Sequence, residues 1–199
     1  VHIEPLRAQG SGRRYYRLRV KETTMVWCAY SHQQRENAAF PAFADFLASL
    51  DINVPRVVMH LCDVGEYVVD DLNEASLLTI ADPHEIERLL REIVRQIARL
   101  HVLGGIAARR SEVPLQNGFS KGLYDWERDY FREYILVRLL HAPQIWSPAA
   151  REYRGVRDTL LCEPLVPIHR DLQSANIMVV EGKPFFIDFQ GMRLGCAAY

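Results

Sequence analysis

The first third of the chain shows hydrophobic and polar positions in short alternating runs. Residues 15–20 and 25–30 are rich in aromatic and β-branched side chains, and a polar break, Lys21–Thr24, separates them. This arrangement predicts a β-hairpin. Two more strand-like runs lie at residues 56–61 and 67–69. The N-terminal region is therefore expected to contain an antiparallel sheet.

The hydrophobic spacing changes to three and four residues over 36–50, which predicts an amphipathic helix in that interval. Pro41 marks either a kink or the true start of this helix. The same spacing predicts three later helices, over residues 82–101, 123–140 and 149–161. We expect the first two of these to pack against each other, because each has an apolar stripe to bury.

Turn-forming residues separate the predicted helices. Gly104–Gly105 and residues 114–122 are expected to be loops. The chain as a whole reads as an α+β protein with a small β-rich lobe over residues 1–72 and a mainly helical lobe over residues 73–199.

Composition narrows the function classes. The chain has 199 residues, 49% of them hydrophobic, and 24 Lys and Arg balance 25 Asp and Glu. A nucleic-acid partner is not expected, since binding to a phosphate backbone usually requires a basic excess. The 4 cysteines form no C-x-x-C pair, so we expect reduced thiols rather than a zinc site. No apolar run approaches the roughly 20 residues of a membrane span, so no membrane partner and a cytoplasmic setting are expected.

The most informative residues lie near the C-terminal end. Asp171 follows His169 and Arg170, Asn176 comes five positions after Asp171, and Asp188 follows an apolar hairpin-like pair of runs. Phosphoryl transfer requires an oriented hydroxyl and bound metal ions rather than covalent chemistry from the protein. Asp171 would accept or orient the proton of the attacking hydroxyl, and Asn176 and Asp188 would hold Mg²⁺. Each residue alone is more often a cap or a turn former, but their order around a hairpin favours a kinase site.

These motifs resemble the protein-kinase-like superfamily and, within it, the aminoglycoside phosphotransferase family. The spelling of residues 169–178 and 187–193 is most similar to the bacterial anomeric sugar kinases of cell-wall recycling and their uncharacterised relatives. The resemblance implies a two-lobed kinase-like fold, here with an incomplete C-terminal lobe. It also implies ATP and Mg²⁺ as cofactors and a small-molecule acceptor, an amino sugar, as partner.

The resemblance assigns two nucleotide-binding segments. Gly10, Ser11 and Gly12, with help from Arg14, would cover the ATP phosphates with backbone N–H groups. Asp71 and Leu72 would belong to the hinge beside the adenine. Without the resemblance, Gly10–Gly12 would be interpreted as an ordinary turn, and Asp71–Leu72 as the end of a strand before a helix.

One departure from the family pattern concerns a cation. The superfamily usually places a phosphate-binding Lys on the strand predicted at 25–30, which contains none. Lys21 lies in the preceding turn, so Arg14 or Arg35 is the candidate replacement. Without that Lys, Glu36 loses its usual partner and is expected only to favour the start of its helix.

Three further expectations follow from the resemblance. His169 is expected to be structural. Gln190 stands where some aminoglycoside kinases carry a second acid. Trp126, Tyr130 and Phe131 belong to a helix that borders the acceptor pocket in the family. We expect these aromatic side chains to lie in the core, with sugar stacking on Trp126 as the alternative.

Several functions remain open. The leading one is an ATP- and Mg²⁺-dependent kinase acting on an amino sugar hydroxyl. The acceptor is alternatively an aminoglycoside, a choline-like alcohol or a protein hydroxyl. A non-catalytic nucleotide-binding switch is also open: the missing strand Lys favours it, and the set Asp171, Asn176 and Asp188 opposes it.

Overall fold

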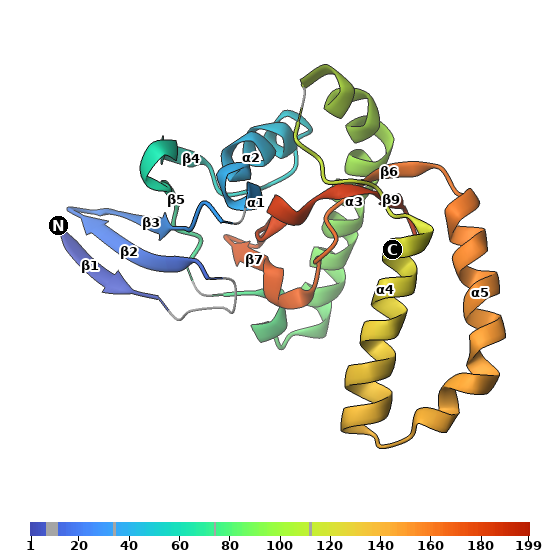
Figure 1. Cartoon of the computed structure of the whole chain (residues 1–199). Coiled ribbons are helices and arrows are strands. Elements are labelled where there is room, and N and C mark those ends of the chain that lie inside the picture. The colour runs from blue at the N-terminus through green and yellow to red at the C-terminus, as the bar shows by residue number, and fades with distance from the viewer. Residues whose placement is uncertain (7–11, 34, 74, 112) are drawn as a thin grey trace.

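The N-terminal part of the computed structural model is an antiparallel sheet (Figure 1). The structure describes residues 1–6, 12–33, 35–73, 75–111 and 113–199. The five strands are arranged in the order β1-β2-β3-β5-β4. Their bounds are His2–Pro5, Arg14–Val20, Thr23–Ala29, Val57–Leu61 and Glu66–Asp70 for β1 to β5. The predicted hairpin is confirmed as β2–β3, whereas the edge strand β1 was not predicted.

The turn between β4 and β5 depends on a glycine. A short 3₁₀ turn, Cys62–Val64, ends at Gly65, whose φ of 73° lies in the left-handed region. A Cβ at this position would lie 2.6 Å from the carbonyl oxygen of Tyr30. Only glycine fits both the backbone conformation and this close approach. The predicted turn at Gly65 is therefore confirmed.

The predicted helix over residues 36–50 is divided in two. α1 spans Arg35–Ala38 and α2 spans Phe40–Ser49, with Pro41 in the first turn of α2. Proline is tolerated in a first turn because its missing N–H would be unpaired there anyway. Pro41 thus marks a true helix start, one of the two alternatives that the sequence allowed.

α3 spans Pro83–Ser111 and continues well past its predicted end. The loop predicted at Gly104–Gly105 is wrong, because both glycines lie within this helix. A Cβ on Gly104 would lie 3.3 Å from Pro167 and 3.2 Å from Leu100. The glycine therefore allows the strand that contains Pro167 to pack closely on α3, and it is a packing position rather than a helix end.

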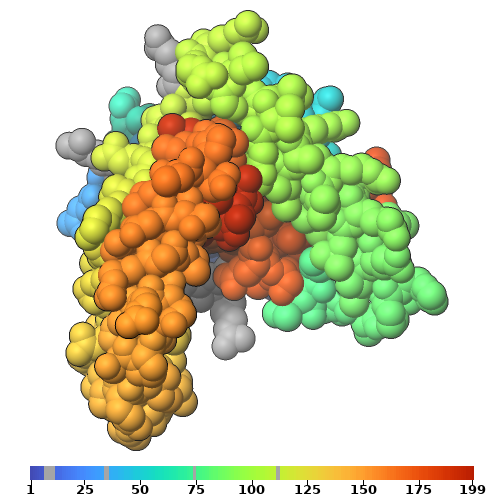
Figure 2. Space-filling view, turned by 90° about the vertical axis from the view of Figure 1, so that its right-hand side faces the viewer, coloured from blue at the N-terminus to red at the C-terminus, as the bar shows by residue number. Residues whose placement is uncertain are grey.

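α4 and α5 form a helical hairpin at one side of the molecule (Figures 1 and 2). α4 spans Lys121–Phe131 and continues as a π-helical stretch, Arg132–Leu139; α5 spans Trp146–Cys162. The helices predicted at 123–140 and 149–161 are thus confirmed. The predicted packing of α4 on α3 is wrong, since α4 lies along α5 instead.

Trp126, Tyr130 and Phe131 of α4 are not in the core, contrary to expectation, whereas Tyr124 of the same helix is buried against Phe119. Trp126, Tyr130 and Phe131 are each about half exposed. Because α3 does not cover this face, the apolar side of α4 meets solvent. The same stripe continues into the π-helical stretch through Tyr134, which stacks on Tyr130 at a centroid distance of 4.4 Å.

Two small antiparallel strand pairs complete the C-terminal part. β6 (Leu165–Ile168) pairs with β9 (Arg193–Cys196), and β7 (Ile177–Val180) pairs with β8 (Lys183–Phe186). The two-residue turn between β7 and β8, Glu181–Gly182, has positive φ at both positions. Such turns match the twist of a hairpin, and this one confirms the predicted hairpin.

A hydrophobic core connects the sheet to the β7–β8 pair and to the segment that follows it. The Phe40 ring of α2 stacks on Tyr67 of β5 and on Phe189, with centroid distances of 4.4 and 4.7 Å. Leu89 and Ile93 of α3 belong to the same core. The segment that contains Asp188 is therefore held against the N-terminal sheet by buried side chains.

No helix among the described residues is long and apolar enough to cross a membrane.

Candidate active site

A cleft of about 750 Å³ lies between the five-stranded sheet and the β7–β8 hairpin. Four of the residues singled out from the sequence line it: Asp71, Leu72, Asn176 and Asp188. The apolar part of its lining includes Val26, Val69, Leu72, Met178 and Ile187. An apolar cleft with a few charged groups at one end is typical of a site for a small molecule such as a nucleotide.

Asp171 and Asn176 are held together by the backbone. The Asn176 side-chain amide donates to the carbonyl oxygen of Asp171 at 2.8 Å, and Gln173 N–H donates to the same oxygen at 2.9 Å. Asn176 is buried, whereas Asp171 is exposed. Arg170, directly before Asp171, has a φ of 79°, a conformation that is unusual for a residue with a side chain. The tight turn fixes the Asn176 side chain beside an accessible Asp171.

Asp188 also has a left-handed backbone, with φ 63°. Its carboxylate oxygen Oδ1 accepts hydrogen bonds from Arg13 Nη2 at 2.6 Å and from Gln190 Nε2 at 2.7 Å. Burial alone would raise the pKa of Asp188, but the hydrogen bond and charge of Arg13, with the Gln190 bond, hold this pKa below its ordinary value. The carboxylate is thus kept ionised at one end of the cleft.

The carboxylate of Asp171 lies beside the turn that follows Asp188. A Cβ on Gly191 would lie 3.7 Å from Asp171 Oδ2. The three residues predicted to carry the chemistry, Asp171, Asn176 and Asp188, are therefore brought together by two turns. Asn176 and Asp188 line the cleft, whereas Asp171 is exposed and does not belong to its lining.

The side-chain oxygens of Asn176 and Asp188 suit a metal ion that is bound jointly by the protein and by substrate phosphates, rather than by protein ligands alone. Among the described residues there is no cluster of three or more His, Cys, Asp or Glu side chains that would hold a metal alone. Mg²⁺ in phosphoryl-transfer sites is commonly held by one or two protein oxygens together with substrate phosphates. An amide oxygen from Asn176 and a carboxylate from Asp188 match that requirement.

His169 is buried behind this turn. Its ring lies edge-on to Phe186 at a centroid distance of 6.0 Å. Neither ring nitrogen has a hydrogen-bond partner of standard geometry among the described residues. Burial lowers the pKa of His169 to about 4, so the imidazole is neutral near pH 7. A buried neutral ring is in keeping with a structural role.

A buried ion pair fixes the predicted hinge. Arg17 of β2 donates to both carboxylate oxygens of Asp71, at 2.6 and 3.2 Å, and both side chains are more than nine-tenths buried. The Asp71 side chain is thus used within the protein. Leu72 and the backbone around it face the cleft. The pair ties the segment after β5 to β2.

The predicted phosphate-covering loop is only partly described. Gly10 and Ser11 lie outside the described residues, and Gly12 has a left-handed φ of 68°. Arg14 is exposed, and Arg13 is the buried arginine that enters the cleft.

Arg13 and Arg17 were missed in the sequence. Side chains alternate along a strand, so residues 13, 15 and 17 share one face of β2. The alternation of side chains can be recognised in the sequence, but it does not show which of the two faces of the strand is buried.

Glu36 has a partner that the sequence did not indicate. Gln116 Nε2 donates to Glu36 at 2.8 Å, and Arg193 donates to the side-chain oxygen of Gln116 at 2.5 Å. This chain of polar contacts connects α1 to β9, just after the turn that contains Asp188. Glu36, expected only to favour its helix start, is therefore also part of a link between two segments 157 positions apart.

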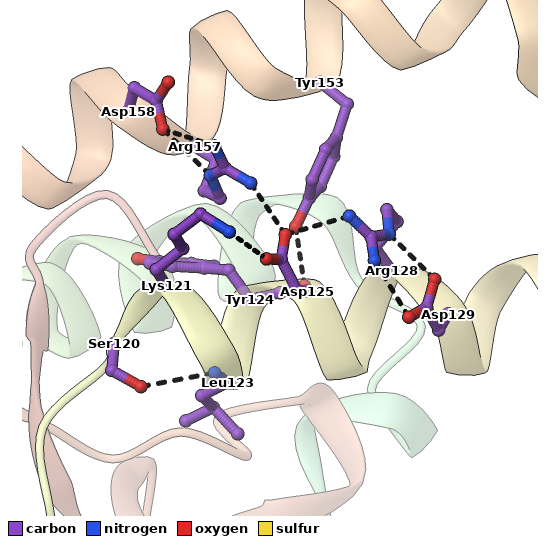
Figure 3. Close-up of polar contacts among 10 residues, drawn as sticks. All are labelled: Ser120, Lys121, Leu123, Tyr124, Asp125, Arg128, Asp129, Tyr153, Arg157 and Asp158. Carbon is purple, nitrogen blue, oxygen red and sulfur yellow. Dashed lines mark hydrogen bonds and ion pairs between the residues drawn. The ribbon is translucent and has the colours of Figure 1, made fainter.

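A cluster of ion pairs around Asp125 joins α4 to α5 (Figure 3). Asp125 accepts from Lys121, Arg128 and Arg157 at 2.7 to 2.9 Å. Hydrogen bonds from Lys121 and Arg157 lower the pKa of Asp125 to about 2. Arg128 also forms a two-bond contact with Asp129. These aspartates are matched by cations on the same two helices.

Comparisons with known proteins show the family and the fold. The family profile described as "Phosphotransferase enzyme family" matches residues 2–199. An N-acetylmuramate/N-acetylglucosamine kinase of Pseudomonas aeruginosa is 24% identical over 204 residues, covering 100% of this chain and 58% of its own length. The chain therefore spans a little over half of the curated relative that it matches.

Two solved structures share the fold. The GDP complex of an aminoglycoside 2'-phosphotransferase aligns with a TM-score of 0.70 at 14% identity, covering 98% of this chain and 68% of its own. A thermostable aminoglycoside phosphotransferase in complex with ADP and hygromycin B aligns with a TM-score of 0.59 at 12% identity, covering 100% and 69%. The predicted kinase-like α+β fold is confirmed, while the lobe boundary near residue 72 stays a prediction.

Proposed function

The chain belongs to the phosphotransferase enzyme family, and from that premise we propose that it moves the terminal phosphoryl group of ATP to a hydroxyl of an amino sugar. The observation that carries the proposal is that Asp171 lies beside Asn176 and beside the turn after Asp188, while Asn176 and Asp188 line the cleft. The similarity to an N-acetylmuramate/N-acetylglucosamine kinase supports the acceptor class, and a structural neighbour with bound ADP supports the nucleotide.

In the proposed reaction, Asp171 orients the acceptor hydroxyl and takes its proton. The oxygen–phosphorus bond forms as the bond from the terminal phosphorus to the ADP oxygen breaks. Asp171 suits this task because its carboxylate is exposed while its backbone is fixed by Asn176 and Gln173. A positioned base of this kind contributes typically a factor of 10² to 10⁴ in rate.

Asn176 and Asp188 would hold the Mg²⁺ ion, which when bound would neutralise the phosphate charge. The adenine would lie against the apolar lining near Leu72, at the segment that the Arg17–Asp71 pair fixes. The phosphates would then extend toward Asp188, the charged end of the cleft. Gly10 and Ser11, with Gly12 and Arg14, remain the predicted cover of the phosphates.

The charge of the α4–α5 hairpin bears on the acceptor. If this hairpin borders the acceptor pocket, as the family resemblance implies, a polycationic aminoglycoside would need unpaired acids there. Asp125 and Asp129 are instead paired with Lys and Arg side chains (Figure 3), and Asp158 and Glu133 are paired with arginines. With these four acids neutralised by cations, an uncharged or acidic amino sugar fits the hairpin better, with the exposed Trp126 ring as a stacking surface.

The test is transfer of label from γ-labelled ATP to a panel of N-acetylmuramate, N-acetylglucosamine, an aminoglycoside and choline. We expect label on an N-acetylated amino sugar and at least a hundredfold loss of rate in Asp171→Asn. Nucleotide binding should persist in that variant, because Asp171 does not belong to the lining of the cleft. A full-rate Asp171→Asn enzyme would show that Asp171 is not the base, and transfer to choline alone would exclude the sugar.

A further inference from the structure

The cation beside Asp188 in the cleft is Arg13, which precedes β2, and not a residue of β3, where the family usually has a Lys. Val26 and Cys28 of β3 share a face, and the first lines the cleft. The Cys28 thiol is fully buried. Burial raises its pKa, and the nearby positive charge of Arg13 partly offsets that increase. Cys28 pairs with Tyr15 in the β2–β3 register, two positions from Arg13. The guanidinium of Arg13 therefore reaches the side of β3 that faces the cleft.

The Arg13 side chain is buried and held by contacts with Tyr15 and Asp188. Its side chain is 8% exposed, and its guanidinium lies 5.9 Å from the Tyr15 ring centroid. Its hydrogen bond to Asp188 joins residues 175 positions apart. Arg14, a candidate from the sequence, is exposed on the opposite face of β2. Lys21, which the sequence already disfavoured, lies beyond the far end of that strand.

The pair with Asp188 conflicts with metal binding at the same carboxylate. Arg13 and Gln190 both donate to Oδ1. A divalent cation bound to Asp188 would lie a few ångströms from the guanidinium, and two cations at that separation in a partly buried site repel each other strongly. Phosphate groups arriving with the metal would remove this conflict, because they offer the guanidinium a new anionic partner.

We propose that Arg13 is the phosphate-binding cation of this protein and that it exchanges Asp188 for the nucleotide phosphates when the metal–nucleotide complex binds. This inference rests on the proposed function, since it takes Asp188 as a metal ligand. Without nucleotide, Arg13 satisfies the Asp188 carboxylate and disfavours the metal alone. With nucleotide, Arg13 performs the role of the absent strand Lys. Metal and nucleotide are thereby made to bind together.

The experiment measures two affinities by calorimetry, using Mn²⁺ as the probe: Mn²⁺ alone, and ATP in saturating Mn²⁺. In Arg13→Gln we expect Mn²⁺ alone to bind roughly tenfold more tightly, because the repulsion is gone. ATP should bind roughly tenfold to a hundredfold more weakly, because a charge-assisted contact to phosphate is lost. Opposite changes in the two affinities are the signature, since general damage to the site would weaken both.

Two further variants sharpen the result. Arg19→Gln is the matched control on the same strand, because Arg19 is half exposed and 3.5 Å from Glu4; it should leave both affinities unchanged. Arg13→Lys keeps the charge but loses the planar fork, so we expect near-normal Mn²⁺ affinity and an intermediate ATP affinity.

Failure of the inference and failure of the proposed function give different results. If the unmodified protein binds ATP with Mn²⁺ and Asp188→Asn loses the Mn²⁺-dependent part of that binding, the metal and nucleotide roles in the proposed function stand. In that case, equal affinities in Arg13→Gln and the unmodified protein would overturn only the role of Arg13. A loss of ATP affinity in Arg14→Gln but not in Arg13→Gln would likewise reassign the phosphate contact. If the unmodified protein binds no metal–nucleotide complex, both proposals fall.

Discussion

The cleft and the α4–α5 hairpin hold their polar groups in opposite ways. In the cleft, ion pairs are buried or partly buried and join distant segments, such as Arg17 with Asp71 and Arg13 with Asp188. On the hairpin, most contacts lie within one helix or between adjacent helices, and the rings of Trp126, Tyr130 and Phe131 are about half exposed. Burial at the cleft fixes side chains whose positions matter for chemistry. The exposed hairpin can change its surface without disturbing them, as expected where specificity varies within a fold.

The largest difference should appear when an aromatic ring is removed from each region. Phe189→Ala deletes a fully buried ring stacked on Phe40, and we expect a loss of about 3 to 5 kcal/mol in the free energy of unfolding. Trp126→Ala deletes a ring that is 56% exposed and should change that free energy by no more than about 0.5 kcal/mol. Urea unfolding followed by circular dichroism measures both. Equal losses would mean that the hairpin face is covered in solution.

Ion pairs provide the second contrast. Arg17→Met leaves the buried Asp71 carboxylate without its cation, and we expect a loss of about 3 kcal/mol. Arg128→Met breaks a pair on the hairpin surface, where solvent screens the charge, and should have little effect. The double variant Arg17→Met/Asp71→Leu should recover most of the first loss. No recovery would show that Arg17 stabilises the protein through packing rather than through Asp71.

The pH dependence of stability tests the burial of His169. Its pKa is lowered from 6.5 to about 4 by burial, so between these values the unfolded chain binds a proton that the folded protein does not. The free energy of unfolding is therefore unaffected by His169 above about pH 6.5 and decreases as the pH falls toward 4. At pH 5 the loss is about 2 kcal/mol. His169→Phe should reduce the slope of Tm against pH in this window, whereas an unchanged slope would assign the effect to other groups.

The smallest expected effect concerns the link from α1 to β9. Gln116→Ala removes the bridge between Glu36 and Arg193 without touching the cleft. We expect roughly a tenfold fall in kcat with an unchanged KM for ATP, because the turn that contains Asp188 loses support while the nucleotide contacts remain. Gln116→Glu would place a carboxylate against Glu36 and should behave no better. Steady-state kinetics separates this positioning role from binding, and an increase in KM alone would contradict it.

The sequence was most informative where residues act locally. The β2–β3 and β7–β8 hairpins, the division at Pro41 and the turn at Gly65 follow from side-chain alternation and backbone preferences within a few residues. The grouping of Asp171, Asn176 and Asp188 could also be predicted, because one hairpin separates the last two. Each of these features depends on short-range geometry.

Predictions failed where packing between distant segments decides. The glycines at 104 and 105 look like a break until Pro167 is placed against them. The aromatic face of α4 looks like core until α4 is found beside α5 rather than α3. Propensity gives each residue's preference, and tertiary contacts can override it.

The sequence by itself determined most of the helices and hairpins, the phosphotransferase motifs and the absence of a cation on β3. Only the tertiary structure decided which charges meet: Arg13 rather than Arg14 at Asp188, Arg17 at Asp71, and Gln116 between Glu36 and Arg193. The reason is physical, because a strand's period of two assigns residues to two faces but does not say which face is buried. That choice is made by the core, which fixes the sheet on Phe40 and Phe189 and turns one row of β2 toward the cleft.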